Sequence, residues 1–249
     1  MTMRNFCLPI VKSVILSFLG FLIPSTYQPP TYGNNYELSS TQPTLQSIDN
    51  RNYTQAQIDY FLEIALGSEY GSSNPTIKKW DKNLRIKVIG LPTPEDWQTL
   101  STVIDEINTI TQGSIQINFD DNNPNLKIYF VPEYEFRRYE PYYRPVNFGF
   151  VRTWWNNQVI YKSRIMISTT SITQKARSHL IREELTQSIG LMRDSYKYRN
   201  SVFFQGWTDT TEYAEIDQAV IEMLYRPEIR PGMTKAEVIN VLNSLRFER

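Results

Sequence analysis

Hydrophobic residues recur at regular spacing between residues 54 and 249, and their spacing predicts a set of helices and strands. Apolar positions three and four residues apart indicate helices, and an apolar position at every second residue indicates a strand. The predicted helices are 54–66, 93–112, 172–190, 211–225 and a last helix that starts with the capping box Thr234–Glu237. The predicted strands are 84–90, 114–119, 126–131, 148–155 and 158–168, the last two joined by an Asn156-Asn157 turn. This order predicts an α+β fold with a mixed sheet over the helix at 172–190.

The helix at 172–190 is expected to organise the domain, because charged and amide side chains fall on its apolar side. On a helical projection, one polar stripe is made by Lys175, Ser178, Arg182 and Thr186. Glu184 and Gln187 fall in the opposite arc with the apolar residues, and Glu183 lies at its margin. Polar groups turned inward need partners, at roughly 1–3 kcal/mol for each unpaired group. The pattern therefore indicates a site in a cleft, working or vestigial, or else a structural helix with buried polar partners.

Two segments precede the predicted domain. In residues 1–24, basic residues are followed by the apolar run 14–23, which is typical of a secretory signal peptide and too short for a confident membrane span. The alternatives are an uncleaved N-terminal anchor and a buried hydrophobic helix. Residues 25–52 consist of Pro, Ser, Thr, Gln, Asn and Tyr with almost no aliphatic side chains, which predicts a disordered linker. We therefore expect a domain at 53–249 in a secreted, periplasmic or cell-envelope protein, held at the membrane only if the N-terminal segment is retained.

Composition excludes several classes of function. The chain has 26 Lys and Arg against 26 Asp and Glu, so its balance gives no electrostatic reason to expect a nucleic-acid partner. Cys7 is the only cysteine and His179 the only histidine. These counts rule out a disulfide within the chain and zinc sites of four cysteines, of paired cysteines and histidines, or of three histidines.

A charged and aromatic segment lies between the strands at 126–131 and 148–155. Residues 133–145 hold three acids, three arginines and five aromatic side chains. Tyr and Arg both stack and form hydrogen bonds, so the segment would suit a ligand platform. The interpretation that we favour is a solvated excursion whose charges pair with one another.

The helix at 172–190 resembles the metal-binding helix of zincin metallopeptidases. That helix carries HExxH, and the metzincins extend it to HExxHxxGxxH, often followed by Asp. In this register Glu184 matches the general-base glutamate, Gly190 the turn glycine and Asp194 the following aspartate. The three metal positions differ from histidine and hold Glu183, Gln187 and Arg193.

Three longer stretches strengthen the resemblance. Residues 183–191, 206–213 and 224–233 are similar to a family of secreted bacterial proteins of unknown function with EExxQ in place of HExxH. The likeness extends over about 54–245. It implies a zincin-like, metzincin-type fold: a mixed sheet, a central active-site-type helix and C-terminal helices, with Phe203 at the methionine position of the Met-turn. It supplies no activity.

The substitutions at the metal positions predict a site without zinc or any other cofactor. Gln187 offers only a neutral amide oxygen, and Arg193 is a fixed cation that cannot ligate a metal. We expect Arg193 to take the electrostatic place of the metal and pair with Glu184, because a buried carboxylate left alone would take up a proton. His179 lies one turn before Glu183 and would reach it, although we favour a half-exposed position for this histidine.

Three functions stay open on these grounds. The favoured one is a zincin-fold pseudoenzyme that binds a peptide or a glycan in the former cleft. The second is an active hydrolase that uses Glu184 as a base, with a hard cation or with none. The third is a structural cell-envelope protein in which the polar helix has no ligand. Metal analysis would separate a metal-dependent hydrolase from the others, and binding screens would separate the first from the third.

Overall fold

The computed structural model describes residues 53–66, 75–141, 143 and 147–245, and it shows a mixed sheet packed against helices. The strands are β1 (Lys79–Trp80), β2 (Leu84–Gly90), β3 (Ile117–Phe119), β4 (Leu126–Val131), β5 (Gly149–Asn156) and β6 (Val159–Ser168). The helices are α1 (Gln55–Leu66), α2 (Pro94–Thr111), the 3₁₀ turn η2 (Glu133–Glu135), α3 (Phe136–Tyr139), α4 (Gln174–Ser188), α5 (Glu215–Tyr225) and α6 (Lys235–Ser244). The segments expected as a signal peptide (1–24) and a linker (25–52) lie outside the described residues.

The sheet is parallel except at one edge. Its order is β1-β6-β4-β2-β3, all neighbours being parallel, and β5 pairs antiparallel with β6. The β5–β6 hairpin turns at Asn157 and Gln158, whose φ values of 48° and 66° suit a type I′ turn. The expected turn at Asn156-Asn157 was therefore one residue too early. Since β5 pairs with no second strand in the described part of the chain, it forms an edge of the sheet.

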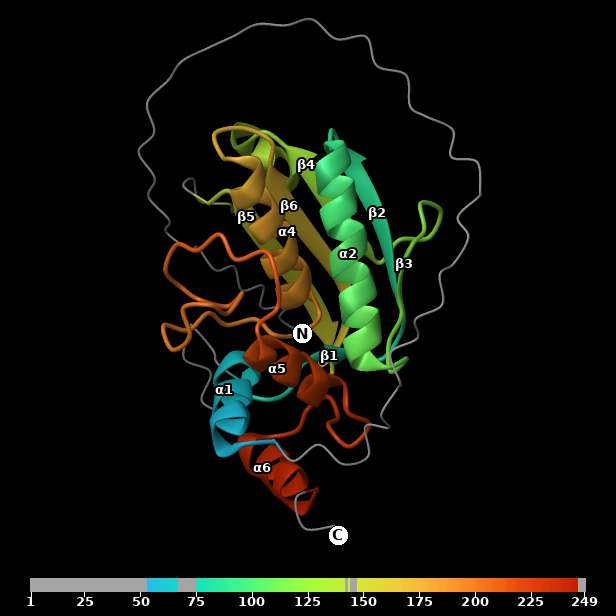
Figure 1. Ribbon diagram of the computed structural model, residues 1–249. Coiled ribbons are helices and arrows are strands. Elements are labelled where there is room, and N and C mark those ends of the chain that lie inside the picture. The colour runs from blue at the N-terminus through green and yellow to red at the C-terminus, as the bar shows by residue number, and fades with distance from the viewer. Residues whose placement is uncertain (1–52, 67–74, 142, 144–146, 246–249) are drawn as a thin grey trace, which may run out of the picture. The chain divides into compact units, whose positions relative to one another are not determined.

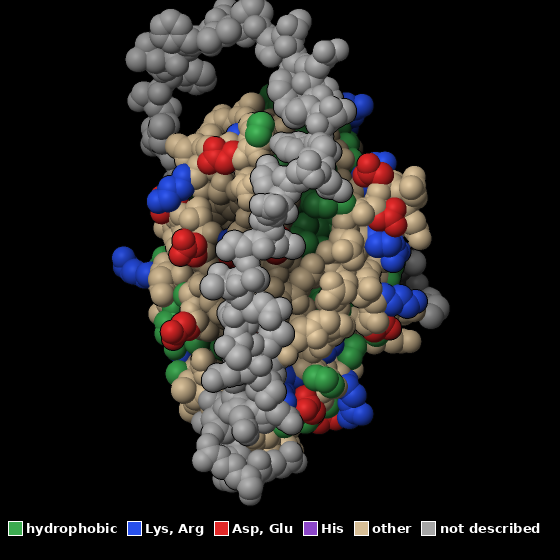
Figure 2. Space-filling view, turned by 45° about the vertical axis from the view of Figure 1, so that its right-hand side comes forward, with side chains coloured by type: hydrophobic (Ala, Val, Ile, Leu, Met, Phe, Trp, Pro, Cys, Tyr) green, Lys and Arg blue, Asp and Glu red, His purple; other side chains and the backbone are tan. Residues whose placement is uncertain are grey.

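Helices α2 and α4 lie side by side across one face of the sheet, and α1, α5 and α6 gather at the end where β1 lies (Figure 1). The main hydrophobic core fills the space between these layers. None of the helices among the described residues is long and apolar enough to cross a membrane. On the face seen in Figure 2, acidic and basic side chains are interspersed around the rim, in keeping with the balanced charge of the chain.

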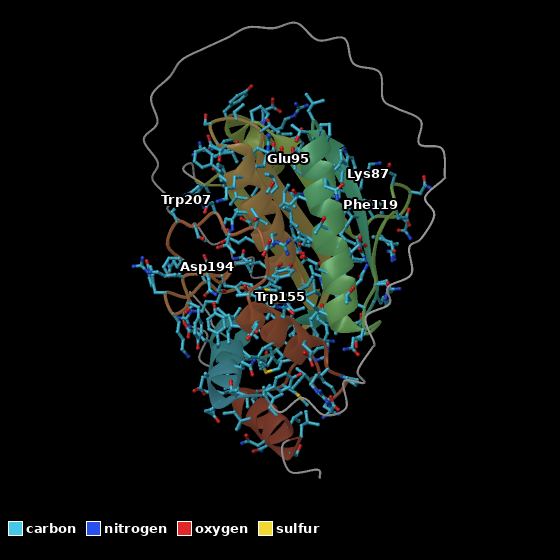
Figure 3. All side chains as sticks on the ribbon, in the orientation of Figure 1. Lys87, Glu95, Phe119, Trp155, Asp194 and Trp207 are labelled. Carbon is cyan, nitrogen blue, oxygen red and sulfur yellow. The ribbon has the colours of Figure 1, made fainter. Side chains whose placement is uncertain are left out.

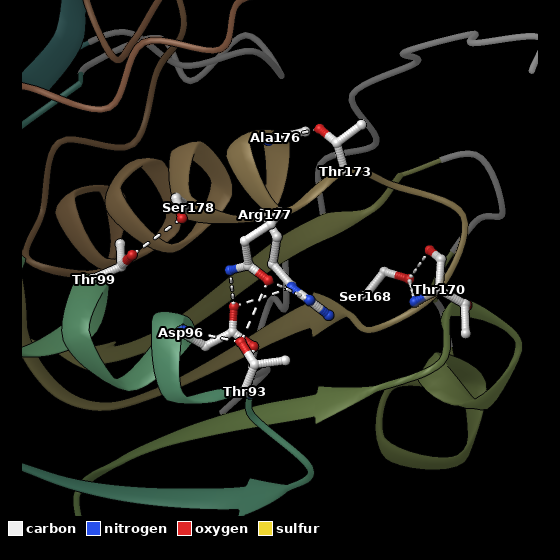
Figure 4. A network of polar contacts seen from close by, with 10 residues as sticks. Thr93, Asp96, Thr99, Ser168, Thr170, Thr173, Ala176, Arg177 and Ser178 are labelled. Carbon is white, nitrogen blue, oxygen red and sulfur yellow. Dashed lines mark hydrogen bonds and ion pairs between the residues drawn. The ribbon is translucent and has the colours of Figure 1, made fainter. Parts of the chain in front are cut away.

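A buried carboxylate ties the first turns of α2 and α4 together (Figure 4). Asp96 completes the capping box of α2 by accepting a hydrogen bond from the backbone of Thr93 at 2.8 Å. The same carboxylate accepts a 2.7 Å hydrogen bond from Gln174 and forms an ion pair with Arg177 at 3.0 Å. Because Gln174 and Arg177 belong to the first turn of α4, this network fixes where α4 begins.

The segment after β4 does not form the solvated excursion that we favoured. Phe136 and Tyr143 are buried, and Glu140 pairs with Arg152 of β5 and Arg164 of β6. Hydrophobic burial explains the difference, because the segment covers one end of the second face of the sheet. The second core cluster consists of Tyr129, Val131, Phe136, Tyr143, Phe150 and Met166.

The α+β fold class, the mixed sheet over a central helix and the C-terminal helices are confirmed. The predicted helices and strands are present, with ends that differ by a few residues. The largest difference is at α5, which begins at Glu215 instead of residue 211. Its start is set by Asp217, whose carboxylate accepts the backbone N–H of Ala214 at 3.0 Å and so caps the helix there.

Candidate functional site

Helix α4 carries the candidate site, and it is buried on every side rather than amphipathic. From its third residue onward every residue is buried, including Ser178, Arg182 and Thr186 of the predicted polar stripe, whereas Lys175 is exposed. Ser178 contacts Thr99 of α2 at 3.1 Å, and the Arg182 guanidinium lies 4.3 Å from the ring centre of Tyr213. Thr186 forms a 2.6 Å hydrogen bond with the Tyr213 hydroxyl. Beyond Lys175 the stripe therefore faces α2 and the segment before α5, so the solvent-facing side implied by the projection holds only at Lys175.

His179 and Glu183 form a buried pair one turn apart on α4. The Nε2 atom of His179 lies 3.1 Å from Oε2 of Glu183, and its Nδ1 lies 2.8 Å from the backbone oxygen of Thr210. A carbonyl oxygen only accepts, so Nδ1 is the donor to Thr210 and the other ring nitrogen faces the Glu183 carboxylate. Our favoured half-exposed position for His179 was wrong, because the segment before α5 covers it. The alternative, contact with Glu183, is confirmed.

Gln187 and Asp194 form the second polar pair. The amide nitrogen of Gln187 donates to Oδ1 of Asp194 at 2.7 Å, and both side chains are buried. Asp194 thereby holds the loop that follows α4 against the last turn of the helix. This contact uses the side chain that stands at the second metal position of the zincin register.

Glu184 lies beneath the edge strand. A Cβ atom placed on Gly149, the first residue of β5, would lie 2.5 Å from Oε1 of Glu184 and 2.8 Å from Leu180. The carboxylate and the strand can approach this closely only because residue 149 has no side chain. Sequence reasoning missed Gly149, whose only local signal was a glycine at the start of a strand.

Arg193 does not take the place that we expected. Its side chain is partly exposed, and the ion pairs among the described residues do not join it to Glu183 or Glu184. The next residue, Asp194, turns inward to Gln187. The predicted Arg193–Glu184 pair is therefore wrong, and Glu183 has His179 as its partner instead.

The register positions do not fit a metal ion. Gln187 already donates its amide to Asp194, Arg193 cannot ligate, and Glu183 faces His179. Within the described ranges, no group of three or more His, Cys, Asp or Glu residues is arranged to hold a metal.

A second buried carboxylate supports the loop beneath the site. Asp217 of α5 accepts hydrogen bonds from the Ser201 hydroxyl at 2.5 Å and from the backbone N–H of Val202 at 3.2 Å. Burial raises the pKa of Asp217 to about 6, although its hydrogen bonds oppose the shift. Ser201 also contacts the Tyr60 hydroxyl at 2.8 Å, and Phe203 of the same loop is fully buried. These contacts therefore hold the loop in place. The only signal of this in the sequence was an acidic residue early in α5.

The close approach of Gly149 to Glu184 predicts a coupled pair of substitutions. Gly149→Ala should lower the free energy of unfolding by about 1–3 kcal/mol, because the new methyl group overpacks the carboxylate. Shortening the neighbour with Glu184→Ala should recover part of that loss. A double-mutant cycle in urea measures the coupling, expected to be at least about 0.5 kcal/mol. Strictly additive effects would mean that β5 does not lie over Glu184.

A sheet that is parallel except for an antiparallel edge strand, with a central polar helix beneath that edge, defines a mixed α+β domain. The chain belongs to the family described as "Protein of unknown function (DUF2927)", whose model matches residues 54–244.

Two solved structures of myroilysin are similar to this chain. One is 10% identical with a TM-score of 0.41, over 60% of this chain and 83% of that one. The other is 13% identical with a TM-score of 0.29, over 64% and 69%. Scores this low carry no argument about chemistry. No curated protein matches the chain.

Proposed function

We propose that this domain binds an extended peptide along β5, above α4, and neither uses a metal nor hydrolyses the peptide. One observation carries the proposal: the side chains at two of the three metal positions are engaged in internal polar contacts. Glu183 faces His179 at 3.1 Å, and Gln187 donates to Asp194 at 2.7 Å. A helix with these contacts is suited to hold the shape of a cleft rather than to activate water.

The edge strand favours a peptide as the ligand. In the described part of the chain β5 pairs with β6 alone, so its other edge offers backbone N–H and C=O groups. An extended peptide can add to such an edge as a further strand, with alternate side chains entering the cleft. A glycan, the other ligand class considered for this cleft, would not use these backbone groups in register.

Two side chains of β5 point toward the proposed cleft. Thr153 lies 3.6 Å from the sulfur of Met192 in the loop after α4. Trp155, on the same face of the strand, is partly exposed, with the Lys78 ammonium 5.4 Å from its ring centre (Trp155 and Asp194 are labelled in Figure 3). A partly exposed tryptophan at the end of an edge strand is a suitable anchor for one side chain of the ligand.

A mixture of unstructured peptides, made by tryptic digestion of casein, tests the proposal. The purified protein should retain a subset of these peptides intact, as read by mass spectrometry, and should contain no stoichiometric zinc. Trp155→Ala should weaken retention about tenfold or more, while Trp154→Ala, which removes the neighbouring ring on the opposite face of β5, should not.

Each other outcome contradicts the proposal. New cleavage products that disappear in Glu184→Gln would identify an active hydrolase. Zinc at one equivalent would show that the register positions ligate after all. Retention of no peptide would favour a structural role for the polar helix.

A further inference from the structure

Four basic residues form one transverse row across the sheet. Lys87 of β2 is the register partner of Lys127 of β4, which is the partner of Arg164 of β6, which in turn is the partner of Arg152 of β5. Neighbouring strands lie about 4.8 Å apart, so this basic row spans roughly 14 Å. Register partners project from the same face of a sheet, so the four side chains point to one side.

The basic row lies on the face away from α2 and α4. The residues that precede or follow its members along the strands, among them Ile86, Ile128 and Ile165, are buried in the main core beneath those helices. Successive side chains of a strand alternate between faces, so the row faces the opposite side. At one end of that face the segment after β4 covers the second core, and its Glu140 contacts Arg152 and Arg164 of the row.

The row has an excess of positive charge. Arg85 lies two residues before Lys87 on β2, and Lys162 lies two residues before Arg164 on β6. Together with the row they make six cations: Arg85, Lys87, Lys127, Arg152, Lys162 and Arg164. The ion pairs among the described residues give them two carboxylates: Glu140 for Arg152 and Arg164, and Asp120 for Arg85. Six cations against two carboxylates leave four positive charges, although the whole chain has 26 of each sign. Like charges directly opposite one another destabilise a sheet, so the basic row lowers the stability of the fold when nothing is bound to it.

The geometry points to an acidic polysaccharide, a chain of sugars that carry carboxylates, as the ligand of this face. Arg152 and Arg164 already hold a carboxylate, since Glu140 reaches them at 2.5 and 3.5 Å. The remaining lysines of the row extend the same chemistry across two more strands, which is farther than one carboxylate can reach. A polymer with carboxylates at regular intervals can reach the lysines of the row that Glu140 does not.

Other polyanions fit this face less well. Non-specific binding of single-stranded nucleic acid uses aromatic rings on which successive bases stack. Here three cations lie within 5.5 Å of the ring centre of Trp154, and Tyr129 packs on Tyr139 with ring centres 4.5 Å apart. A membrane surface would need protruding basic and apolar groups. Lys87, Lys127 and Arg164 are only partly exposed, and Arg152 is buried.

Binding of polygalacturonate oligomers to the full chain, measured by calorimetry with neutral dextran as the reference polymer, tests the inference. The wild-type protein should bind the polyuronate and not dextran, more weakly as salt rises. The double variant Lys87→Gln/Lys127→Gln should bind about tenfold more weakly or worse. The matched control Lys175→Gln/Lys235→Gln removes the same charge from exposed positions of α4 and α6 and should bind as the wild type does.

The melting temperatures of the variants distinguish loss of binding from loss of the fold. Removing two like charges from one row should leave the melting temperature unchanged or higher, so loss of binding is not loss of fold. Failure to bind polygalacturonate, or an equal loss in the control variant, overturns the inference. Tighter binding of oligo-dT or of phosphatidylglycerol vesicles would assign the face to nucleic acid or to membrane instead. None of these outcomes depends on peptide binding at β5.

Discussion

Replacing Gly190 with alanine should lower the free energy of unfolding by about 4 kcal/mol. Gly190 has φ = 123°, and a Cβ there would lie 2.2 Å from the backbone oxygen of Lys78. A side chain at such a φ costs roughly 1–3 kcal/mol, and overpacking adds about 1–3 kcal/mol more. Because the nearest atom is a backbone carbonyl, the strain cannot be relieved by turning a side chain away. Urea denaturation of the two proteins measures the difference.

The chain offers a matched control in Gly232. Its φ of 88° is also positive, but the nearest atom to a new Cβ is Cγ of Gln158 at 3.7 Å, an ordinary contact. Gly232→Ala should therefore lower the free energy of unfolding only by the cost of the positive φ, about 1–2 kcal/mol. Equal losses in the two variants would show that the close approach to Lys78 does not hold the end of α4.

The position of Gly190 matters for the site because the end of α4 is fastened to two other elements. The indole of Trp80 in β1 donates to the backbone oxygen of Ser188 at 2.9 Å, and the Tyr225 hydroxyl of α5 donates to that of Ile189 at 2.8 Å. These side chains satisfy two of the carbonyls that a helix end leaves unpaired. The loop that brings Asp194 to Gln187 therefore starts from a fixed point.

Local sequence patterns predicted the elements but not the surroundings of α4. Apolar spacing and capping residues such as Thr93 and Thr234 act within a few residues, so they located helices and strands well. The burial of His179 depends on Thr210, which is 31 residues away and has no pattern of its own. A projection of α4 alone could not show that α2 and the segment before α5 cover its polar stripe.

Of the contacts expected at the candidate site, the one between His179 and Glu183 is present and the one between Arg193 and Glu184 is not. The zincin register singled out Glu183 and Gln187, because residues four apart share a helix face. It suggested a wrong partner for Glu184, since the direction of Arg193 is set by the contact of Asp194 with Gln187. The basic row had no local signal at all: its residues come together only through the strand order β2-β4-β6-β5.

Asp217→Ala should lower the free energy of unfolding at pH 7 by about 3 kcal/mol. The substitution leaves three donors without their acceptor: the Ser201 hydroxyl and the backbone N–H groups of Val202 and Ala214. Each buried donor left unpaired costs roughly 1–3 kcal/mol, and partial solvation of the cavity offsets some of this sum. Asp209→Ala, which removes an exposed aspartate that pairs with Lys175, is the control and should change the denaturation midpoint little.

The cost of Asp217→Ala should depend on pH, and the sign follows from the direction of the pKa shift. Burial raises the pKa of Asp217 from 3.8 to about 6, so between these values the folded protein holds a proton that the unfolded chain releases. Wild-type stability therefore falls as pH rises through this window, by roughly 1.4 kcal/mol for each pH unit, and the alanine variant lacks this contribution. The difference between the two proteins should be about 2 kcal/mol larger at pH 4.5 than at pH 7. Urea midpoints at the two pH values measure it, and other titrating groups cancel because both proteins share them. A difference that grew toward pH 7 would mean that the folded protein stabilises the ionised carboxylate, contrary to a pKa raised by burial.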